Sequence, residues 1–354
     1  MDSKKENQKN VHEGISVGAL KAIGCEVALK CFLDARMLDF CTPVFFASNK
    51  AISEQINALG FELRFHGVHD AAKVVDGKIN VVNIWKEPFP LQFGKATAEG
   101  GKYAIKSLRS AEAALKKDVV DVLVTAPINK NNIQADNFTF PGHTDYLGQE
   151  LEGESLMFMV TNDIKVGLLT DHIAVKDVVQ TITTKLIRDK VTTISKSLKM
   201  DFGIRRPKIA MLGINPHSGD NGTIGKEDEE IMKPAIAKLF NEGFLVYGPY
   251  SADSFFGSKT HLGFDAVLAA YHDQGLIPFK TLSFGQGVNY TAGLSKIRTS
   301  PDHGTAYEIA GKNQADESSF KEAFFTAIQL FKNRKDFKEL TKNPLKKQSA
   351  KRAS

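Results

Sequence analysis

Cysteine is scarce in this chain of 354 residues, which contains only Cys25, Cys31 and Cys41. The three cysteines form neither a CxxC motif nor a zinc-finger spacing. They are also too few and too irregular for the disulfide framework of a small secreted protein. The cysteine pattern therefore predicts a protein of a reducing compartment.

Long hydrophobic runs are absent as well. No apolar run approaches the roughly 18 residues that a membrane-spanning helix needs. The first ten residues, MDSKKENQKN, are charged and are not followed by the apolar segment of a secretory signal. With 42% hydrophobic residues, the chain is long enough for two lobes with a sizeable core. We expect a cytoplasmic, globular protein without a membrane partner.

Positive charge is unevenly distributed along the chain. The formal net charge is +5, yet residues 332–354 contain nine lysines and arginines against Asp336 and Glu339. The rest of the chain is therefore slightly acidic, and it lacks the aromatic and basic interleaving of a nucleic-acid module. We expect a flexible N-terminus at 1–13, a disordered basic tail at 332–354 and no nucleic-acid partner. A contact between the tail and nucleic acid or a membrane is the alternative.

Segments with the composition of buried strands alternate with segments of helical period. Apolar residues at helical spacing predict a helix over 98–117, and a second helix is expected over 221–242. Strands that alternate with helices form βαβ units and a largely parallel sheet, so the fold class is α/β. The predicted strands cover residues 15–20, 44–47, 119–125, 156–160, 166–170, 209–214 and 265–270.

Three of these strands are followed by a histidine. His172, His217 and His272 each come shortly after an apolar run. The last of them lies in a run of four polar residues at 271–274, and Gly275 is then expected to let the chain leave the strand. Ligands of α/β proteins bind outside the carboxyl ends of the strands. Three histidines with one open position are typical of a catalytic metal site. The alternative is three unrelated loop histidines.

Candidate anion-binding residues lie in two other segments. Lys280, Asn289 and Arg298 occur among glycines and small polar residues, where Arg and Lys would bind a carboxylate or phosphate. A solvated basic loop is the alternative there. His143 and Thr144 can also donate hydrogen bonds to an anion, although Thr144 could instead cap a helix.

The first strand leads into a turn that contains Gly18 and Gly24. Such a turn can bring backbone N–H groups close to a phosphate at a helix N-terminus, but the GxGxxG spacing is absent. A plain strand-to-helix turn explains the two glycines equally well.

Five segments of the chain resemble one family. They are VTAPINK, PGHTDYLG, LGINPHSGDNG, DAVLAAYHDQGLIPFK and GVNYTAGLSKIRTSPDHGTAYEIAG, and the resemblance extends from residue 14 to residue 330. The chain is similar to the 4-hydroxythreonine-4-phosphate dehydrogenase family of vitamin B6 (pyridoxal 5′-phosphate) biosynthesis. This resemblance implies a two-lobed α/β/α sandwich of the isocitrate/isopropylmalate-dehydrogenase-like type with a mostly parallel sheet.

The same resemblance implies how the lobes and subunits are organised. The first lobe, on the cofactor side, would consist of residues 14–125 and 285–331. The second lobe, at 126–284, would carry the metal and substrate site and the dimer interface. The protein would be a homodimer with shared active sites. His172 and His217 of one subunit and His272 of the other would hold one divalent metal ion, which is zinc, magnesium or cobalt.

The resemblance also assigns substrate and cofactor residues. A small phosphorylated hydroxy acid would contact His143, Thr144, Lys280, Asn289 and Arg298. The segment DHGTAYEIAGK is similar to the cofactor loop of isopropylmalate dehydrogenases. It would place His303, Gly304 and Thr305 beside NAD or NADP.

The implied reaction is an oxidative decarboxylation of 4-phosphohydroxy-L-threonine to 3-amino-2-oxopropyl phosphate. A metal lowers the pKa of the substrate hydroxyl, hydride passes to the nicotinamide, and the resulting β-keto acid loses carbon dioxide. Asp253, Asp273 and Lys280 are the candidate catalytic residues. The two aspartates are candidates either for proton transfer or for orienting a metal ligand, and the sequence leaves both roles open.

One segment departs from the family. Where the family usually has the pattern G-(D/E)-x-x-G-I-G-x-E, this chain has Ala19 in place of the acid and Ala22 in place of the middle glycine. Lys21 adds a further positive charge. Activity, substrate choice or cofactor preference could each change.

Three hypotheses follow from the sequence. The first is the B6-pathway dehydrogenase, and the second is a related dehydrogenase for a threonate or erythronate phosphate. The third is a non-catalytic binding or regulatory protein that retains the fold.

Overall fold

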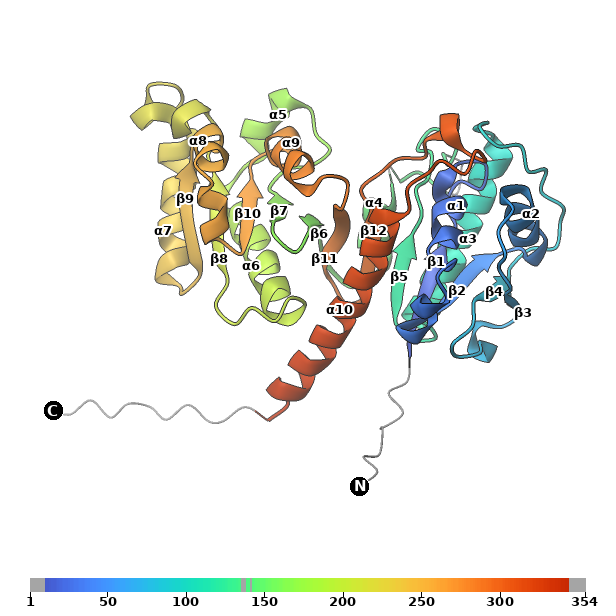
Figure 1. The fold of residues 1–354 in the computed structure, drawn as a ribbon. Helices are drawn as coiled ribbons and strands as arrows, with labels where there is room; N and C mark the ends of the chain where they lie inside the picture. The colour runs from blue at the N-terminus through green and yellow to red at the C-terminus, as the bar shows by residue number, and fades with distance from the viewer. Residues whose placement is uncertain (1–9, 135–137, 141, 344–354) are drawn as a thin grey trace.

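The computed structural model describes residues 10–134, 138–140 and 142–343. Figure 1 shows two groups of strands and helices side by side. One sheet of twelve strands passes through both groups. Its order is β3 (His66–Val68), β4 (Asn80–Asn83), β2 (Cys41–Ala47), β1 (Val11–Ser16), β5 (Val122–Thr125), β12 (Ile297–Pro301), β11 (Val288–Leu294), β6 (Gly153–Val160), β7 (Lys165–Leu168), β10 (Ala266–Ala269), β8 (Lys208–Leu212) and β9 (Leu245–Tyr250).

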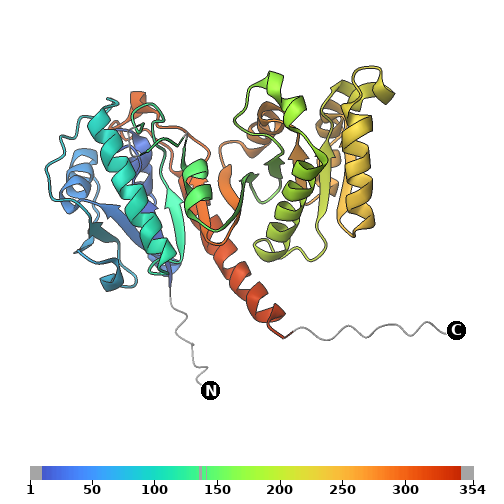
Figure 2. The same ribbon diagram turned by 180° about the vertical axis from the view of Figure 1, so that it is seen from behind.

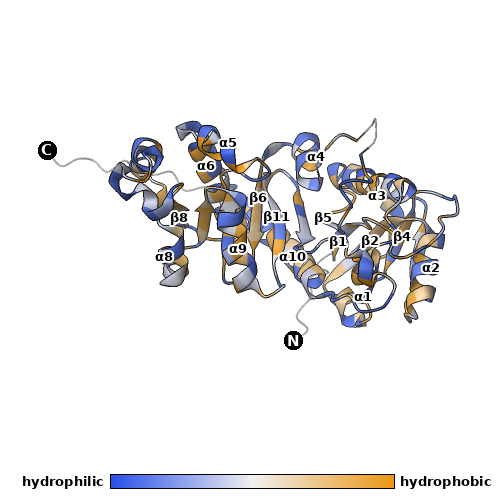
Figure 3. Cartoon of the chain, turned by 90° about the horizontal axis from the view of Figure 1, so that it is seen from above, coloured by the Kyte–Doolittle hydropathy of each residue, from blue (hydrophilic) through white to orange (hydrophobic). Residues whose placement is uncertain are grey.

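Helices lie on both sides of this sheet, as the view from above shows (Figure 3). The α-helices are α1 (Ile23–Lys30), α2 (Asn49–Leu59), α3 (Ala98–Lys116), α4 (His143–Glu150), α5 (Val175–Thr181), α6 (Thr184–Met200), α7 (Lys233–Asn241), α8 (Ala252–Gly257), α9 (His272–Ser283) and α10 (Ser318–Thr341). Short 3₁₀ segments lie at Ala35–Asp39, Ala71–Lys73, Pro216–Gly222, Thr260–Gly263 and Tyr307–Ile309, and a π-turn lies at Asp228–Met232. The predicted α/β/α class with a mostly parallel sheet is confirmed.

Two parallel halves of opposite direction meet in the middle of the sheet. The strands from β3 to β12 in the sheet order are mutually parallel. The strands from β7 to β9 are also mutually parallel. Between the halves, β11 and β6 each run antiparallel to both of their neighbours. The boundaries predicted for the two lobes stay a prediction, because one continuous sheet passes through both.

Both faces of the sheet are buried in its central part, which explains why several strands have nearly continuous apolar sequences. In β2, Val44 and Phe46 belong to the same core cluster as Leu108 of α3. Phe45 points to the other face, where its ring meets Phe32 at a centroid distance of 6.1 Å. Figure 2, which shows the molecule from behind, shows α3 in front of the first half of the sheet.

All seven predicted strands have a counterpart, and the predicted helix at 98–117 is confirmed as α3. Thr97 caps this helix by accepting a hydrogen bond from the N–H of Gly100. The first strand lies earlier than predicted, because its polar residues His12 and Glu13 are buried. The strands β3, β4, β9, β11 and β12 were not predicted, since they mix apolar residues with Gly, Pro, Asn or Ser.

The helix predicted at 221–242 is confirmed from residue 228 to residue 241 and is wrong at its start. The π-helix Asp228–Met232 continues directly into α7 at Lys233–Asn241. The residues before the π-turn form a turn of left-handed backbone conformation.

The disordered tail predicted from residue 332 is wrong for residues 332–341. These residues are the end of α10, and Arg334 within them is buried. Arg334 donates a hydrogen bond from Nε to Asp201 Oδ1 at 2.7 Å and another from Nη2 to the hydroxyl of Tyr290 at 3.0 Å. This buried ion pair explains why a stretch of basic composition is ordered. Residues 344–354 of the predicted tail, and residues 1–9 of the flexible N-terminus predicted at 1–13, lie outside the described residues. The prediction is wrong for residues 11–13, which are buried in β1.

The prediction that Gly275 frees the chain is also wrong. Helix α9 begins at His272, directly after the N-cap Tyr271, and Gly275 lies in its first turn. A Cβ at Gly275 would lie 2.9 Å from side-chain atoms of Val166, Leu168 and Ala269. The glycine therefore allows α9 to pack closely on β7 and β10. Within the described part of the chain, no helix is both long enough and apolar enough to cross a membrane.

Candidate active site

A cavity of about 310 Å³ lies over the central strands, where the two halves of the sheet meet. The residues predicted to bind substrate all line it, namely His143, Thr144, Lys280, Asn289 and Arg298. His172, His303 and Gly304, from the predicted metal and cofactor sets, line the same cavity. Residues from β5, α4, β6, α9, β11 and β12 are thus brought together, although their roles stay predictions.

Arg298 of β12 is the charged group at the base of this cavity, and its exposed fraction is only 2%. Its guanidinium donates two hydrogen bonds to Thr125 Oγ1, at 3.0 and 2.6 Å, and one to Thr291 Oγ1 at 3.2 Å. Burial lowers the pKa of Arg298 to about 9. No described carboxylate forms an ion pair with it. A buried cation held only by hydroxyls lacks a counter-charge, so Arg298 remains a candidate anion-binding residue.

Neutral polar atoms without a partner surround this charge. The buried atoms His143 Nε2, Asn289 Oδ1 and His303 Nε2 have no hydrogen-bond partner. Burial lowers the pKa of His143 well below its usual value, and the charges of Arg298 and Lys130 lower it further. Burial also lowers the pKa of His303. The two imidazoles therefore offer hydrogen bonds without adding positive charge.

The start of α4 explains why His143 lies in the cavity. The helix begins at His143 with Gly142 as its N-cap, and Thr144 lies in the first turn. Thr144 is therefore not the cap of α4, and its hydroxyl lines the cavity instead.

The three histidines predicted to bind metal follow three adjacent strands. In the sheet order β7-β10-β8, His172 follows β7, His272 follows β10, and His217 follows β8. The rings of His172 and His272 lie 5.9 Å apart between centroids. No set of three His, Cys, Asp or Glu side chains within the described residues is close enough to hold a metal ion. The metal site stays a prediction.

Two side chains connect the ends of these strands. Thr170 Oγ1, after β7, donates to the carbonyl of Ala270 at 2.7 Å. Gln274 Oε1 accepts from the N–H of Ala270 at 2.7 Å, and Gln274 Nε2 donates to the carbonyl of Gly213 at 2.7 Å. The positions of all three histidine-bearing segments are therefore coupled.

His217 lies in a left-handed turn that is held by a buried carboxylate. Five consecutive residues, 217–221, have positive φ, and four of them are not glycine. Such backbone costs about 1 to 2 kcal/mol per non-glycine residue. Asp228 is fully buried and accepts hydrogen bonds from the N–H groups of Ile214 at 2.8 Å and Asn215 at 3.0 Å. This carboxylate fixes the segment that leads into the turn.

The three candidate catalytic residues lie in different surroundings. Lys280 lines the cavity and forms an ion pair with Asp302 at 3.0 Å. Asp273 Oδ1 lies 2.7 Å from His272 Nδ1, which suits a carboxylate that orients a metal ligand. Asp253 is exposed at the start of α8, and a hydrogen bond from Ser251 lowers its pKa. Asp253 and Asp273 do not line the cavity.

The glycine-bearing first loop packs against the predicted cofactor loop. The N–H of Ile23 donates to the carbonyl of Thr305 at 3.1 Å, and the N–H of Ala19 donates to the carbonyl of Pro127 at 3.0 Å. Lys21 is buried, and its ammonium lies 5.1 Å from the ring centre of Phe89. The extra positive charge of this loop therefore does not enter the cavity.

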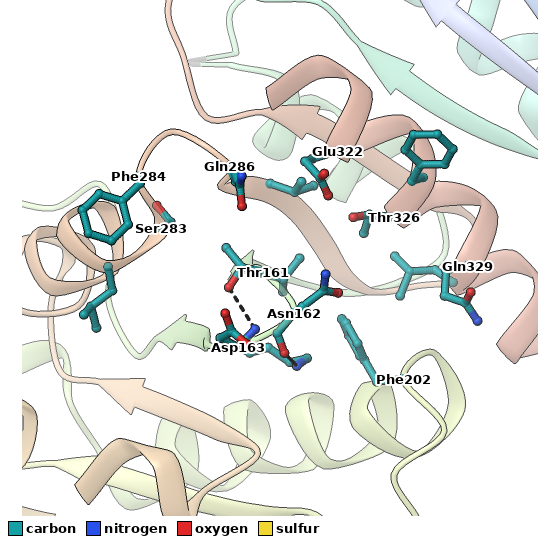
Figure 4. Close-up of a pocket in the computed structure, with 16 residues that line it drawn as sticks. Thr161, Asn162, Asp163, Phe202, Ser283, Phe284, Gln286, Glu322, Thr326 and Gln329 are labelled. Atoms are coloured by element: carbon teal, nitrogen blue, oxygen red, sulfur yellow. Dashed lines mark hydrogen bonds between the residues drawn. The ribbon is translucent and has the colours of Figure 1, made fainter. Parts of the chain in front are cut away.

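A larger hollow of about 540 Å³ lies elsewhere and contains none of the predicted residues. It is formed by the turn between β6 and β7, the end of α9 and one side of α10 (Figure 4). In Figure 4, Asp163 and Glu322 lie on different sides of this hollow. We therefore place the active site in the smaller cavity.

Several supporting residues were missed in the sequence. Asp302 directly precedes the predicted cofactor residues in the sequence, but nothing in its spacing predicts an ion pair with Lys280. Thr125, Thr291 and Asp228 resemble ordinary strand or helix residues, and only their buried hydrogen bonds reveal a role.

Comparison with known proteins then identifies the family. The family model described as pyridoxal phosphate biosynthetic protein PdxA matches residues 39–327. The chain belongs to this PdxA family. A 4-hydroxythreonine-4-phosphate dehydrogenase of Bacteroides thetaiotaomicron is 44% identical to it, over 96% of this chain and 94% of the relative.

Two further relatives extend the comparison. The crystal structure of a 4-hydroxythreonine-4-phosphate dehydrogenase from Burkholderia phymatum has a TM-score of 0.76 and 34% identity, covering 92% of this chain and 99% of that one. A protein of Oceanobacillus iheyensis named "Putative D-threonate 4-phosphate dehydrogenase" is also 34% identical, over 90% of this chain and 97% of its own length. The PdxA family thus includes relatives named for two related substrates.

Proposed function

We propose that this chain is an NAD(P)-dependent dehydrogenase that oxidises 4-phosphohydroxy-L-threonine in pyridoxal 5′-phosphate biosynthesis. The observation that carries the proposal is the buried guanidinium of Arg298. It lines the cavity, and its hydrogen-bond partners are threonine hydroxyls and not a carboxylate. Membership in the PdxA family supports the same substrate class. A phosphorylated hydroxy acid supplies the anion that this cation needs.

The reaction removes two hydrogens from the substrate and then carbon dioxide. The hydroxyl proton goes to a base, and the hydride from the same carbon goes to the nicotinamide. The ketone formed is β to the carboxylate, so the bond to the carboxylate breaks and its electron pair forms an enolate that is then protonated. Lys280 is the candidate for proton transfer, because it lines the cavity whereas Asp253 and Asp273 do not.

A dehydrogenase of this family implies a nicotinamide cofactor. His303, Gly304 and Thr305 would hold it. His303 has a buried ring nitrogen without a partner, and a Cβ at Gly304 would meet no atom within 4 Å. This free space beside an unsatisfied polar atom fits a ligand at the loop.

His172, His217 and His272 would hold one divalent ion, which would polarise the substrate hydroxyl. Imidazole pairs at adjacent strand ends fit zinc or cobalt better than magnesium, which prefers oxygen ligands. The third ligand would come from the second subunit of a homodimer. We place this enzyme in the cytoplasm, where the phosphorylated substrate would be found.

A second substrate is favoured by one specific observation. The relative named for D-threonate 4-phosphate is as similar, at 34% identity, as the solved dehydrogenase from Burkholderia phymatum. The two substrates differ at one carbon, which carries an amine in one and a hydroxyl in the other. The third hypothesis is a binding protein without activity. It is considered because the loop at 18–26 departs from the family pattern.

A substrate panel tests the proposal. Purified protein with zinc, cobalt or magnesium is mixed with 4-phosphohydroxy-L-threonine, D-threonate 4-phosphate or D-erythronate 4-phosphate, together with NAD or NADP. Absorbance of the reduced nicotinamide reports turnover. We expect the highest kcat/KM with 4-phosphohydroxy-L-threonine. A preference for a threonate or erythronate phosphate would favour the alternative, and no turnover with any combination would refute an enzyme of this class.

A further inference from the structure

An ion pair spans the candidate active site. Lys280 belongs to α9, which packs on the second half of the sheet, whereas Asp302 directly follows β12 of the first half. Lys280 Nζ lies 3.0 Å from Asp302 Oδ1, and both residues line the cavity. The pair therefore joins the two sides of the site across the space where a substrate would bind.

The two partners differ in how firmly they are held. The side chain of Asp302 is only 16% exposed, whereas that of Lys280 is 53% exposed. The N–H of Asp302 donates to Ser319 Oγ at 3.0 Å, and this hydroxyl donates to the carbonyl of Gly287 at 3.0 Å. Asp302 is thus fixed to the start of α10 and to the segment before β11.

Gly287 leaves the space that the carboxylate occupies. A Cβ at Gly287 would lie 3.0 Å from Asp302 Oδ2 and 2.8 Å from the ring of Phe279. Phe279 is the residue before Lys280 and is fully buried. The carboxylate of Asp302 and the ring of Phe279, the residue before Lys280, therefore both pack against the same glycine.

The side chain of a half-exposed lysine has many accessible rotamers, so it does not stay in one position without a partner. Among the described carboxylates, Asp302 is the one that forms an ion pair with Lys280. Burial raises the pKa of Asp302, and the ammonium of Lys280 opposes this effect. The ammonium of Lys280 therefore stabilises the charged form of the Asp302 carboxylate.

We propose that Asp302 is a positioning residue that holds the ammonium of Lys280 in the cavity, facing the substrate. The inference rests on the proposed function, because it assigns the partner of a residue of that same site. The pair also cancels one positive charge of the cavity. Arg298 then remains the buried cation that attracts the anionic group, while the ammonium of Lys280 is held where it can donate a proton to the enolate.

Chemical labelling tests the contact without any substrate. The protein is treated briefly with acetic anhydride, and the acetylation of Lys280 is quantified by mass spectrometry relative to the exposed Lys196. Asp302→Asn should increase labelling of Lys280 about three- to fivefold, the factor that an ion pair of this exposure supports. Asp302→Glu should partly restore the low rate. The matched control Asp316→Asn, which removes an exposed carboxylate, should leave labelling unchanged.

Kinetics with a double-mutant cycle test the role. Asp302→Asn should lower kcat about tenfold, with a smaller change in KM, because a mobile ammonium is less often in the reactive position. In a Lys280→Arg background, which retains a cation, the same change should have a much smaller effect. Equal effects in both backgrounds would show that Asp302 acts independently of Lys280 and would overturn the proposal.

The two experiments separate this inference from the proposed function. Labelling that is identical in wild type and Asp302→Asn would refute the contact even if the enzyme turns over its substrate. Faster labelling of the variant in a protein without turnover would uphold the contact while refuting the dehydrogenase assignment.

Discussion

At the scale of single residues, the site is defined by a charge that the protein leaves without a counter-charge. Arg298 is buried with three hydrogen bonds to threonine hydroxyls, whereas the other deeply buried arginine, Arg334, has a carboxylate partner in Asp201. A buried cation without a carboxylate partner reduces stability unless a ligand supplies the anion. The contrast between the two arginines separates a binding residue from a structural one.

This contrast predicts the effect of removing the guanidinium. Arg298→Ala should weaken binding of a phosphorylated hydroxy acid by about 2 to 3 kcal/mol, the range for losing a charged hydrogen bond. Isothermal titration calorimetry measures the change, with Arg206→Ala, at an exposed position, as the control. Affinity equal to that of wild type, in a variant with unchanged circular dichroism, would remove Arg298 from the site.

His143 predicts a pH dependence of stability. Its pKa in the folded protein is well below the ordinary value of 6.5, so below that pH the unfolded chain binds a proton that the folded chain does not. The neutral imidazole of His143 therefore does not reduce the free energy of unfolding above pH 6.5. As the pH falls below 6.5, protonation of the unfolded chain lowers this free energy. Between pH 7 and pH 5, the free energy of unfolding of wild type should decrease by about 1 to 2 kcal/mol more than that of His143→Asn. Urea unfolding at both pH values measures this difference, and parallel decreases in the two proteins would contradict it.

At the scale of elements, the ends of β7, β10 and β8 act as one unit. Thr170 and Gln274 connect the three strand ends, and Asp228 holds the segment before the left-handed turn of His217. Residues with strained backbone persist only where the surrounding structure fixes them. The strain at 217–221 therefore depends on the buried carboxylate.

Asp228→Asn tests this dependence. The amide replaces one acceptor oxygen with an NH₂ group that faces backbone N–H donors, so hydrogen bonds to Ile214 or Asn215 are lost. We expect a loss of about 1 to 3 kcal/mol in the free energy of unfolding, and weaker binding of zinc or cobalt through His217. Urea unfolding and calorimetric metal titration provide the two readouts.

The control for this variant is Glu230→Gln, which removes an exposed carboxylate from the same π-turn. This control should change neither stability nor metal binding. If Asp228→Asn destabilised the protein but bound metal with wild-type affinity, the carboxylate would be structural and would not position His217.

At the scale of the whole molecule, the antiparallel strands β11 and β6 join two parallel halves of opposite direction. This arrangement brings Arg298, Asn289 and Lys280 from different halves to one cavity. The described residues of one chain do not bring three metal ligands together, so the proposed metal site requires a ligand from a second subunit.

Complementation tests whether the site is shared between subunits. His172→Ala and His272→Ala should each be inactive alone. In a mixed dimer with shared sites, both changes fall in one site and the other site stays intact. Each mixed dimer should then have about half the activity of a wild-type dimer, by the symmetry of a two-fold interface. Because the rings of His172 and His272 lie 5.9 Å apart within one chain, a site with both ligands in the same subunit predicts that mixing restores nothing.

Most of the strands, the helix at 98–117 and the types of residue in the candidate site could be predicted from the sequence alone. Apolar runs located seven strands, helical spacing located α3, and the motifs named every predicted substrate residue that lines the cavity. These features depend on local chain geometry, which a run of neighbouring residues specifies.

Only the tertiary structure decided which of these residues meet. Thr125 and Arg298 are 173 positions apart, and Asp201 and Arg334 are 133 positions apart, so their contacts depend on strand order and helix packing. In the sequence, the buried residues Asp228 and Arg334 look like charged residues of exposed segments. A sequence does not show whether a charge has a buried partner. For that reason three features could be recognised only in the folded molecule. They are the helical structure of residues 332–341, the packing of Gly275 and the ion pair between Lys280 and Asp302.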